Sequence, residues 1–200
     1  MRWLRLVLLA VALAGAGAAG AAALGFFHTK GLAEARTIAA VEAGVLYRSD
    51  QPEGEHLKTL RDPYHIRTVV NLRENEPNSS WQKAEEEFCR ANGIRYVQMA
   101  ISQDGFTPAE LAQFLQIVQD PASQPVLLHC EHGRNRTGFA SAVYRIVVQH
   151  WTYEAAVDEA VDRGFHPHSD RGYDHFLRAL GSGDDPFAPE PAAATDSPGT

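Results

Sequence analysis

Residues Val126–Gly138 read VLLHCEHGRNRTG, and the rest of the fold can be predicted outward from them. The stretch opens with an apolar run typical of a buried strand, continues as a cysteine and a glycine-containing loop, and leads into the helical pattern of Phe139–Gln149. A strand, a tight loop and a helix N-terminus in this order predict an anion site, because the loop amides converge and the helix dipole favours negative charge. The same field would stabilise a thiolate at Cys130, which makes this cysteine a candidate nucleophile.

The ten residues His129–Gly138 resemble the HCxxGxxRTG signature of the cysteine-based protein tyrosine phosphatases, and most closely their dual-specificity branch. All six motif positions are met within one window that also has the expected strand, loop and helix around it. Two upstream stretches, Leu46–Pro52 and Ile66–Arg73, resemble the compact phosphatases of plants, fungi and bacteria. The resemblance therefore covers the chain from about Val45 to Leu180.

This resemblance implies that Cys130 attacks phosphorus and forms a cysteinyl-phosphate intermediate, with no metal ion or other cofactor. Arg136 is expected to hold the transferring group, because its planar guanidinium can make two contacts with one phosphate. The backbone amides between these two residues should line the same site. The expected substrate-binding residues are therefore Glu131, His132, Gly133, Arg134, Asn135 and Arg136.

Four residues of the stretch are expected to support the reaction. In the family that it resembles, the histidine before the nucleophile orders the loop, and His129 occupies that position. Thr137 occupies the position of a hydroxyl that lies near the cysteine sulfur and stabilises the thiolate as the leaving group of the second step. Gly133 lets the backbone turn its amides inward, and Gly138 permits close packing at the helix start.

The departing alkoxide or phenoxide needs a proton, so a general acid is also expected. The family that the loop resembles takes this proton from an aspartate on a separate upstream loop. Asp104 stands on a predicted loop before a helix and is the expected acid, although its spacing to Cys130 is a little short. A solvated loop carboxylate is the alternative interpretation of Asp104, and Asp50 and Glu76 are further candidates on other loops.

The charges inside the loop bear on the substrate. Relatives that act on inositol phosphates resemble this chain but carry several Lys or Arg residues there, whereas here Glu131 opposes Arg134. This mixture favours phosphotyrosine or mixed phosphoprotein substrates, with a phosphoinositide or inositol polyphosphate as the alternative. An anion-binding loop of this kind would also suit a sulfurtransferase carrying a persulfide on Cys130, or a non-catalytic module that binds phosphoproteins.

The composition indicates one globular domain, with 44% hydrophobic residues in a chain of 200. The net charge of −7, without a basic stripe, argues against nucleic acid as a partner. Cys89 is expected to be a half-buried helix residue, with a redox role towards Cys130 as the alternative. His166-Pro167-His168 with Asp170 lacks the spacing of a usual zinc site, so no metal is expected.

The N-terminus is expected to lie outside the fold. Arg2 and Arg5 precede the uncharged stretch Leu6–Phe27, a pattern typical of a signal peptide or an N-terminal membrane anchor, here assigned to residues 1–30. Either form would place the domain in a bacterial-type envelope, anchored to the membrane or secreted into the periplasm. The remaining parts are predicted to be a connector with a short helical pattern at 31–43, the phosphatase domain at 44–180 and a disordered tail at 181–200.

Strand and helix patterns alternate along the domain. Strands are predicted over 44–47, 66–72, 94–101 and 125–129. Helices are predicted over 53–61, 81–92, 108–120, 137–149, 152–163 and 170–180. The alternation predicts an α/β fold with a central, mostly parallel sheet flanked by helices, whose ligand crevice lies at the carboxyl ends of the strands.

Two of the helix starts are well marked in the sequence. Ser79 with Gln82 three residues later resembles a capping box, and Thr107 with Glu110 resembles another. Pro108 suits the first helical position after Thr107. We therefore expect helices to begin directly after these two cap residues.

Overall fold

The computed structural model of the protein describes residues 38–167 and 171–189. The predicted signal peptide or anchor at residues 1–30 lies outside them, as do residues 190–200 of the predicted tail. In the part of the chain that the structure describes, no helix is both long and apolar enough to cross a membrane.

The described residues form a sheet of five short strands in the order β1-β2-β5-β3-β4. The strands are β1 (Ala39–Glu42), β2 (Leu46–Ser49), β3 (Thr68–Asn71), β4 (Arg95–Gln98) and β5 (Val126–His129). β1 pairs antiparallel with β2, and the other neighbouring strands pair in parallel. The predicted α/β fold with a central, mostly parallel sheet is therefore confirmed.

The register of the central strands explains where the site forms. β3 and β5 are buried along their whole length, as their aliphatic sequences predict. His129, the last residue of β5, is in register with Ser49 of β2 on one side and with Asn71 of β3 on the other. The three strands end level with one another, so the segment that begins with Cys130 leaves the sheet between the two neighbouring segments.

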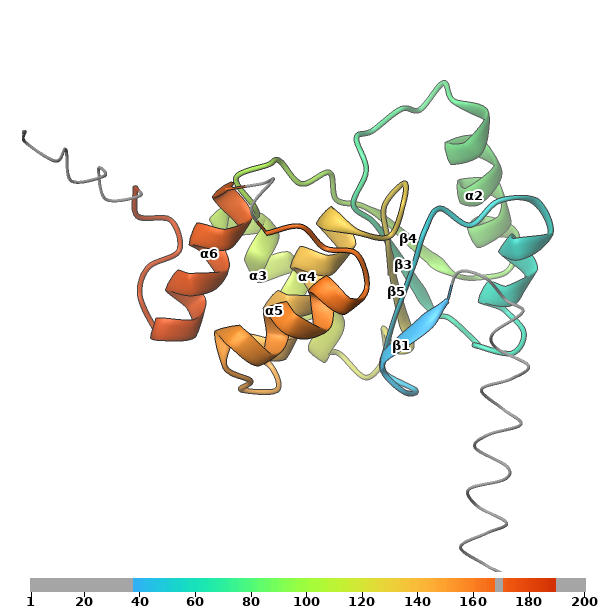
Figure 1. Ribbon diagram of the computed structural model, residues 1–200. Helices are drawn as coiled ribbons and strands as arrows, with labels where there is room; N and C mark the ends of the chain where they lie inside the picture. Colours follow the sequence, from blue (N-terminus) through green and yellow to red (C-terminus); the bar gives the residue numbers. More distant parts are fainter. Residues whose placement is uncertain (1–37, 168–170, 190–200) are drawn as a thin grey trace, which may run out of the picture. The chain divides into compact units, whose positions relative to one another are not determined.

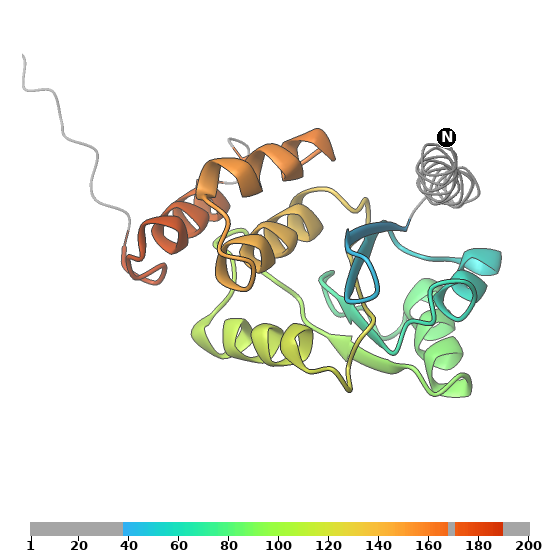
Figure 2. The same ribbon diagram turned by 90° about the horizontal axis from the view of Figure 1, so that it is seen from below.

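Helices cover both faces of the sheet (Figure 1). One face carries η1 (Gly54–Leu60) and α2 (Ser80–Ala91), and the other carries α3 (Pro108–Gln119), α4 (Asn135–Val147), α5 (Tyr153–Asp162) and α6 (Arg171–Ser182). Figure 2 shows the same two layers from below. α4 is buried from Thr137 to Ile146 and contacts β5, α5 and α6, so the helix that follows the reactive cysteine is the centre of its layer.

Both marked helix starts are present. Ser79 caps α2 by accepting a hydrogen bond from the Gln82 amide, and Thr107 caps α3 in a complete capping box with Glu110. At α2 the box is incomplete, because the Gln82 side chain is buried and its Oε1 accepts a hydrogen bond from the Glu76 amide.

Two predictions at the N-terminal side of the fold need correction. Residues 39–42, predicted to belong to a connector with a helical pattern, form β1, and Val41 is buried in the core. A strand of four residues leaves too little periodicity to be told from a helical turn. The helix predicted over 53–61 is the 3-10 helix η1, with Leu57 and Leu60 buried as expected.

The C-terminal side of the fold also extends further than predicted. α6 continues to Ser182, and the chain then folds back onto this helix. Phe187 packs edge-to-face on Phe176 with ring centroids 5.5 Å apart, and His175 Nε2 lies 3.0 Å from the carbonyl oxygen of Ala188. Residues 181–189 therefore belong to the fold rather than to a disordered tail.

Candidate active site

The reactive loop, residues 130–134, connects β5 to α4 at the carboxyl edge of the sheet. Gly133 has a φ of +64°, and a Cβ added there would lie 2.7 Å from backbone atoms of Ser49 and Asp50. Only glycine fits this turn, because a positive φ strains other residues and backbone fills the space that a side chain would need. The loop therefore packs directly on the segment that leaves β2.

Two carbonyl groups of the loop are held from β2 and the segment that follows it. Arg48 Nη2 donates to the carbonyl oxygen of Gly133 at 2.7 Å, and the Gln51 amide donates to that of Glu131 at 3.2 Å. Burial lowers the pKa of Arg48 to about 10, so its guanidinium remains charged at neutral pH. Arg48 also interacts electrostatically with Cys130.

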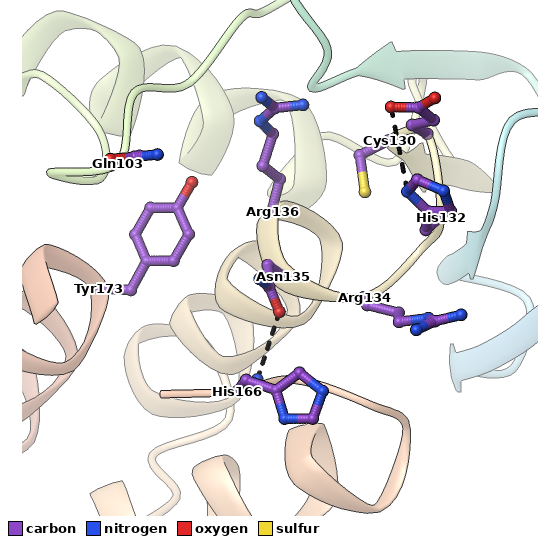
Figure 3. Close-up of a pocket in the computed structure, with 9 residues that line it drawn as sticks. Gln103, Cys130, His132, Arg134, Asn135, Arg136, His166 and Tyr173 are labelled. Carbon is purple, nitrogen blue, oxygen red and sulfur yellow. Dashed lines mark hydrogen bonds and ion pairs between the residues drawn. The ribbon is translucent and has the colours of Figure 1, made fainter. Parts of the chain in front are cut away.

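Cys130 and Arg136 line one cavity of about 450 Å³ (Figure 3). The lining consists of Gln103, Cys130, Glu131, His132, Arg134, Asn135, Arg136, His166 and Tyr173. The structure thus brings the predicted nucleophile and the predicted phosphate-binding arginine to the same space, at the N-terminus of α4. An anion bound there would also lie in the favourable field of the helix dipole.

The Arg136 guanidinium forms an ion pair with Glu74, on the segment that follows β3. The contact uses Nη2, which leaves the other donors of the planar fork available to a phosphate. The Glu74 side chain is 64% exposed, so the pair faces solvent. Sequence reasoning missed Glu74, because nothing distinguishes it from other glutamates of a polar loop.

Three other predicted binding residues lie on the rim of the cavity. Glu131 and His132 are exposed, with 3.9 Å between Glu131 Oε2 and His132 Nδ1. Asn135 Oδ1 accepts a hydrogen bond from the His166 amide at 3.3 Å (Figure 3). This bond ties the start of α4 to the segment between α5 and α6.

The cavity also contains residues that no sequence motif marked. Gln103 comes from the loop before α3, and Tyr173 comes from α6 and stacks on Phe139 of α4 with ring centroids 4.4 Å apart. Arg134, a predicted substrate-binding residue, packs against Gly164, where an added Cβ would come within 3.2 Å of the arginine Cδ. Tertiary packing of α5 and α6 against α4 therefore builds one wall of the site.

Thr137 and Gly138, in the first turn of α4, are both buried. Thr137 Oγ1 has no hydrogen-bond partner among the described residues. A Cβ added at Gly138 would come within 2.9 Å of the Phe165 Cβ. The close packing predicted at this glycine is present in the structure.

His129, the residue before the nucleophile, is fully buried, and its Nε2 lies 3.0 Å from Oε1 of the fully buried Glu85 on α2. This distance suits an ion pair, although the atoms are not aligned as a hydrogen bond. Glu85 Oε2 accepts a hydrogen bond from Gln51 Nε2 at 3.1 Å. Sequence reasoning missed Glu85, but it shares with Gln82 and Cys89 the face that α2 buries, and a carboxylate on a buried face was the available signal.

None of the three predicted general acids lines the Cys130 cavity. Asp104 is exposed and borders a second cavity, between the loop before α3, α6 and the segment 186–189. Asp50 is partly buried beneath Gly133, and burial raises its pKa. Glu76 is exposed on the segment before α2.

The neighbour of Asp104 enters the Cys130 cavity instead. Gln103 lines it, and α6 fixes the loop backbone at this point, because a Cβ added at Gly172 would come within 2.5 Å of the Gln103 carbonyl oxygen. Gln103 and Asp104 are the two turn residues between the bridged Ser102 and Gly105, and of the two only Gln103 lines this cavity. The sequence separation from Cys130 could predict which loop lies near the site, but not which side chain of that loop faces the cavity.

The remaining residues considered from the sequence are Cys89 and the candidate metal ligands. Cys89 is fully buried in α2, and burial raises its pKa to about 12, which disfavours the thiolate that disulfide exchange requires. His168 and Asp170 lie outside the described residues. Within the described ranges no group of three or more His, Cys, Asp or Glu side chains is placed to hold a metal ion.

Comparison with known proteins identifies the family. A model described as "Tyrosine phosphatase family" matches residues 35–173, which cover more than half of the chain. The chain belongs to the tyrosine phosphatase family. The match includes the strand, the reactive loop and the start of α4, and the similar proteins below confirm the predicted dual-specificity-like branch.

The names of two curated relatives refer to different classes of substrate. The chain is 34% identical over 121 residues to dual specificity protein phosphatase TpbA of Pseudomonas aeruginosa, covering 60% of this chain and 51% of TpbA. It is 36% identical over 126 residues to inositol diphosphatase DSP1 of Oryza sativa subsp. japonica, covering 60% of this chain and 54% of DSP1. The chain therefore spans about half the length of the curated relatives that it matches.

Solved structures of phosphatases are also similar to this chain. The core catalytic domain of the PP-IP phosphatase SIW14 from Saccharomyces cerevisiae matches with a TM-score of 0.59 and 26% identity, covering 70% of this chain and 82% of that one. P. aeruginosa TpbA, as a cysteine-to-serine variant in complex with phosphotyrosine, matches with a TM-score of 0.56 and 27% identity, covering 75% and 91%.

Proposed function

We propose that the protein hydrolyses phosphomonoesters through a cysteinyl-phosphate intermediate on Cys130. The observation that carries this proposal is that Cys130 and Arg136 share one cavity at the N-terminus of α4. The thiolate attacks phosphorus, a sulfur–phosphorus bond forms, and the bond to the leaving oxygen breaks. Water then attacks the phosphorus, and the products are inorganic phosphate and the restored thiolate.

The loop supplies the electrostatic part of this reaction. Arg136 binds two oxygens of the phosphate and keeps the transferring group in line with the sulfur. The amides of the reactive loop and the dipole of α4 stabilise the charge that develops on the equatorial oxygens. Thr137 donates a hydrogen bond from its hydroxyl group to the sulfur, which stabilises the departing thiolate in the second step.

The preferred substrate in this proposal is a phosphorylated protein, with phosphotyrosine as the phosphoresidue. The name of TpbA as a dual specificity protein phosphatase and the structure of its variant with phosphotyrosine support this choice. Glu131 on the rim and the net charge of −7 disfavour highly anionic substrates.

One observation favours the second candidate, a diphosphoinositol, which carries a diphosphate group on the inositol ring. Because Asp104 does not line the cavity, a leaving group that needs no proton would react most readily. When the thiolate attacks the terminal phosphorus of a diphosphate, the leaving group is the phosphate that remains on the inositol, and this group needs no proton. Arg134, His132 and His166 could contact the further phosphates on that side of the cavity. The names of DSP1 and SIW14 support this alternative.

The first experiment measures hydrolysis of a small aryl phosphate by the full chain, with a reductant and a chelator present. We expect turnover that survives the chelator and falls to background in Cys130→Ser. Arg136→Lys should lose most of kcat/KM, because an ammonium cannot replace the bidentate fork. Cys89→Ser is the matched control, and it should retain turnover if the protein remains folded.

A second experiment compares phosphotyrosine peptides, phosphoserine peptides and a diphosphoinositol under the same conditions. A higher kcat/KM for phosphotyrosine supports the preferred substrate, and a higher value for the diphosphoinositol supports the alternative. Phosphopeptide binding without turnover would indicate a non-catalytic module. Thiocyanate formation from cyanide and a sulfur donor would indicate a sulfurtransferase.

A further inference from the structure

Glu85 is a buried ionisable group for which the proposed reaction gives no role. It lies on α2, far along the chain from the reactive loop, and its side chain and that of His129 are both 0% exposed. An ionised carboxylate taken out of water costs several kcal/mol (order of magnitude) unless charges and hydrogen bonds compensate it. The residues around Glu85 supply contacts that can compensate this cost.

The hydrogen bonds to Glu85 Oε2 can be followed from a group whose protonation is certain. Arg73 has donors only, and its Nη1 donates to Gln51 Oε1 at 3.3 Å. The Gln51 amide nitrogen must then face the other way, and it donates to Glu85 Oε2 at 3.1 Å. Glu85 Oε2 is therefore an acceptor, and any proton at the carboxyl group would have to lie on Oε1, towards His129.

Each ring nitrogen of His129 lies near one oxygen atom. Its Nδ1 lies 3.4 Å from the carbonyl oxygen of Cys130, and because a carbonyl can only accept, Nδ1 carries a proton. His129 Nε2 lies 3.0 Å from Glu85 Oε1, a distance that suits an ion pair. A proton on Nε2 would give this fully buried pair opposite charges, which compensates the cost of burying the carboxylate.

With both nitrogens protonated, His129 is an imidazolium, and its charge is adjacent to the nucleophile. We propose that Glu85 is a positioning residue: its carboxylate keeps His129 positively charged, and this charge stabilises the Cys130 thiolate that attacks phosphorus. The inference rests on the proposed role of Cys130.

Other titratable groups surround the pair from several elements. Asp50, after β2, interacts electrostatically with His129. Tyr96 of β4 and Cys89 of α2 face Glu85, and burial raises the pKa of each, so both remain neutral near neutral pH. The other charges that interact with these groups are Arg48, Glu86, His56 and His132.

The test uses the full chain and two readouts that need no phosphatase turnover. The first is the pH dependence of Cys130 alkylation by iodoacetamide, followed by mass spectrometry of the modified peptide. In Glu85→Gln the alkylation midpoint should move upward by about one pH unit or more, because a charge stabilising the thiolate is lost. Glu87→Gln removes an exposed carboxylate from the same helix and should leave the midpoint unchanged.

The second readout is the ¹⁵N chemical shifts of the His129 ring in the wild-type protein, assigned with His129→Asn. Shifts of an imidazolium between pH 6 and 8 support the proposal, and this measurement holds even if Glu85→Gln fails to fold. Shifts of a neutral tautomer, or an unchanged alkylation midpoint in folded Glu85→Gln, overturn it. A shifted midpoint in a protein without phosphatase turnover would retain the inference and reject the proposed function.

Discussion

Gly133 has a φ of +64°, and a side chain there would meet the backbone of Ser49 and Asp50. We expect Gly133→Ala to lower the free energy of unfolding by at least about 1–2 kcal/mol, from the left-handed conformation alone. It should also lower kcat about 100-fold, because a displacement of about 1 Å next to the reacting atoms can cost that much. Urea unfolding and aryl phosphate hydrolysis measure the two effects.

Gly93→Ala is the matched control for that substitution. Gly93 also has a positive φ, +67°, but an added Cβ would meet no atom within 4 Å. It should lose a similar amount of stability and keep the wild-type kcat. A wild-type kcat in Gly133→Ala would instead show that the shape of the reactive loop does not limit the reaction.

Asp104 gives a second prediction for single residues. Because it borders a different cavity from Cys130, Asp104→Asn should lower kcat for an aryl phosphate by less than about tenfold, whereas loss of a general acid costs about 10²–10⁴-fold. Gln103→Ala, which changes a side chain in the Cys130 cavity, should have the larger effect of the two. A loss of 100-fold or more in Asp104→Asn, greatest with poor leaving groups, would mean that the loop rotates when substrate binds.

The helix starts give a prediction for whole elements. Thr107 caps α3 in a complete capping box with Glu110, and Thr152 caps α5 by accepting a hydrogen bond from the Ala155 amide. Thr107→Ala and Thr152→Ala should each lower the free energy of unfolding by about 0.5–2 kcal/mol. Neither cap touches the Cys130 cavity, so kcat should not change. A large loss of kcat in only Thr107→Ala would show that the start of α3 controls the adjacent Gln103 loop.

The aromatic core gives a prediction for the whole molecule, because it joins the reactive loop to α3 and α6. Phe139 follows the first turn of α4, is fully buried and packs against Phe106, Tyr173 and Phe176. Phe139→Ala should lower the free energy of unfolding by about 3–5 kcal/mol. It should also raise KM, because Tyr173 lines the cavity.

Phe187→Ala is the control for that core substitution. Phe187 contacts Phe176 but is 41% exposed, so its loss should cost much less stability than the loss of Phe139 and should leave KM unchanged. Equal losses of stability in the two variants, measured by urea unfolding, would show that the segment after α6 is as important to the fold as α4.

Local patterns in the sequence were sufficient to predict the type and order of most elements, the caps at Ser79 and Thr107, and the residues His129–Gly138 as the candidate site. Each of these depends on residues that are close together along the chain: hydrophobic periodicity, a cap and its amide, and a contiguous loop between a strand and a helix. The short strand β1 was missed because four residues carry too little of such a pattern. The N-terminal segment 1–30 and the envelope location stay predictions.

Only the tertiary structure decided which distant residues meet the reactive loop. Arg48 contacts Gly133 of the loop, and Glu74 and Glu85 contact the flanking residues Arg136 and His129, because β2, β5 and β3 end level with one another and α2 packs against the sheet. Their contacts depend on strand register and helix placement, which no local pattern encodes. In the same way, the contact of Gly172 with the loop before α3 sets that loop's rotation, and Gln103 rather than Asp104 therefore lines the cavity.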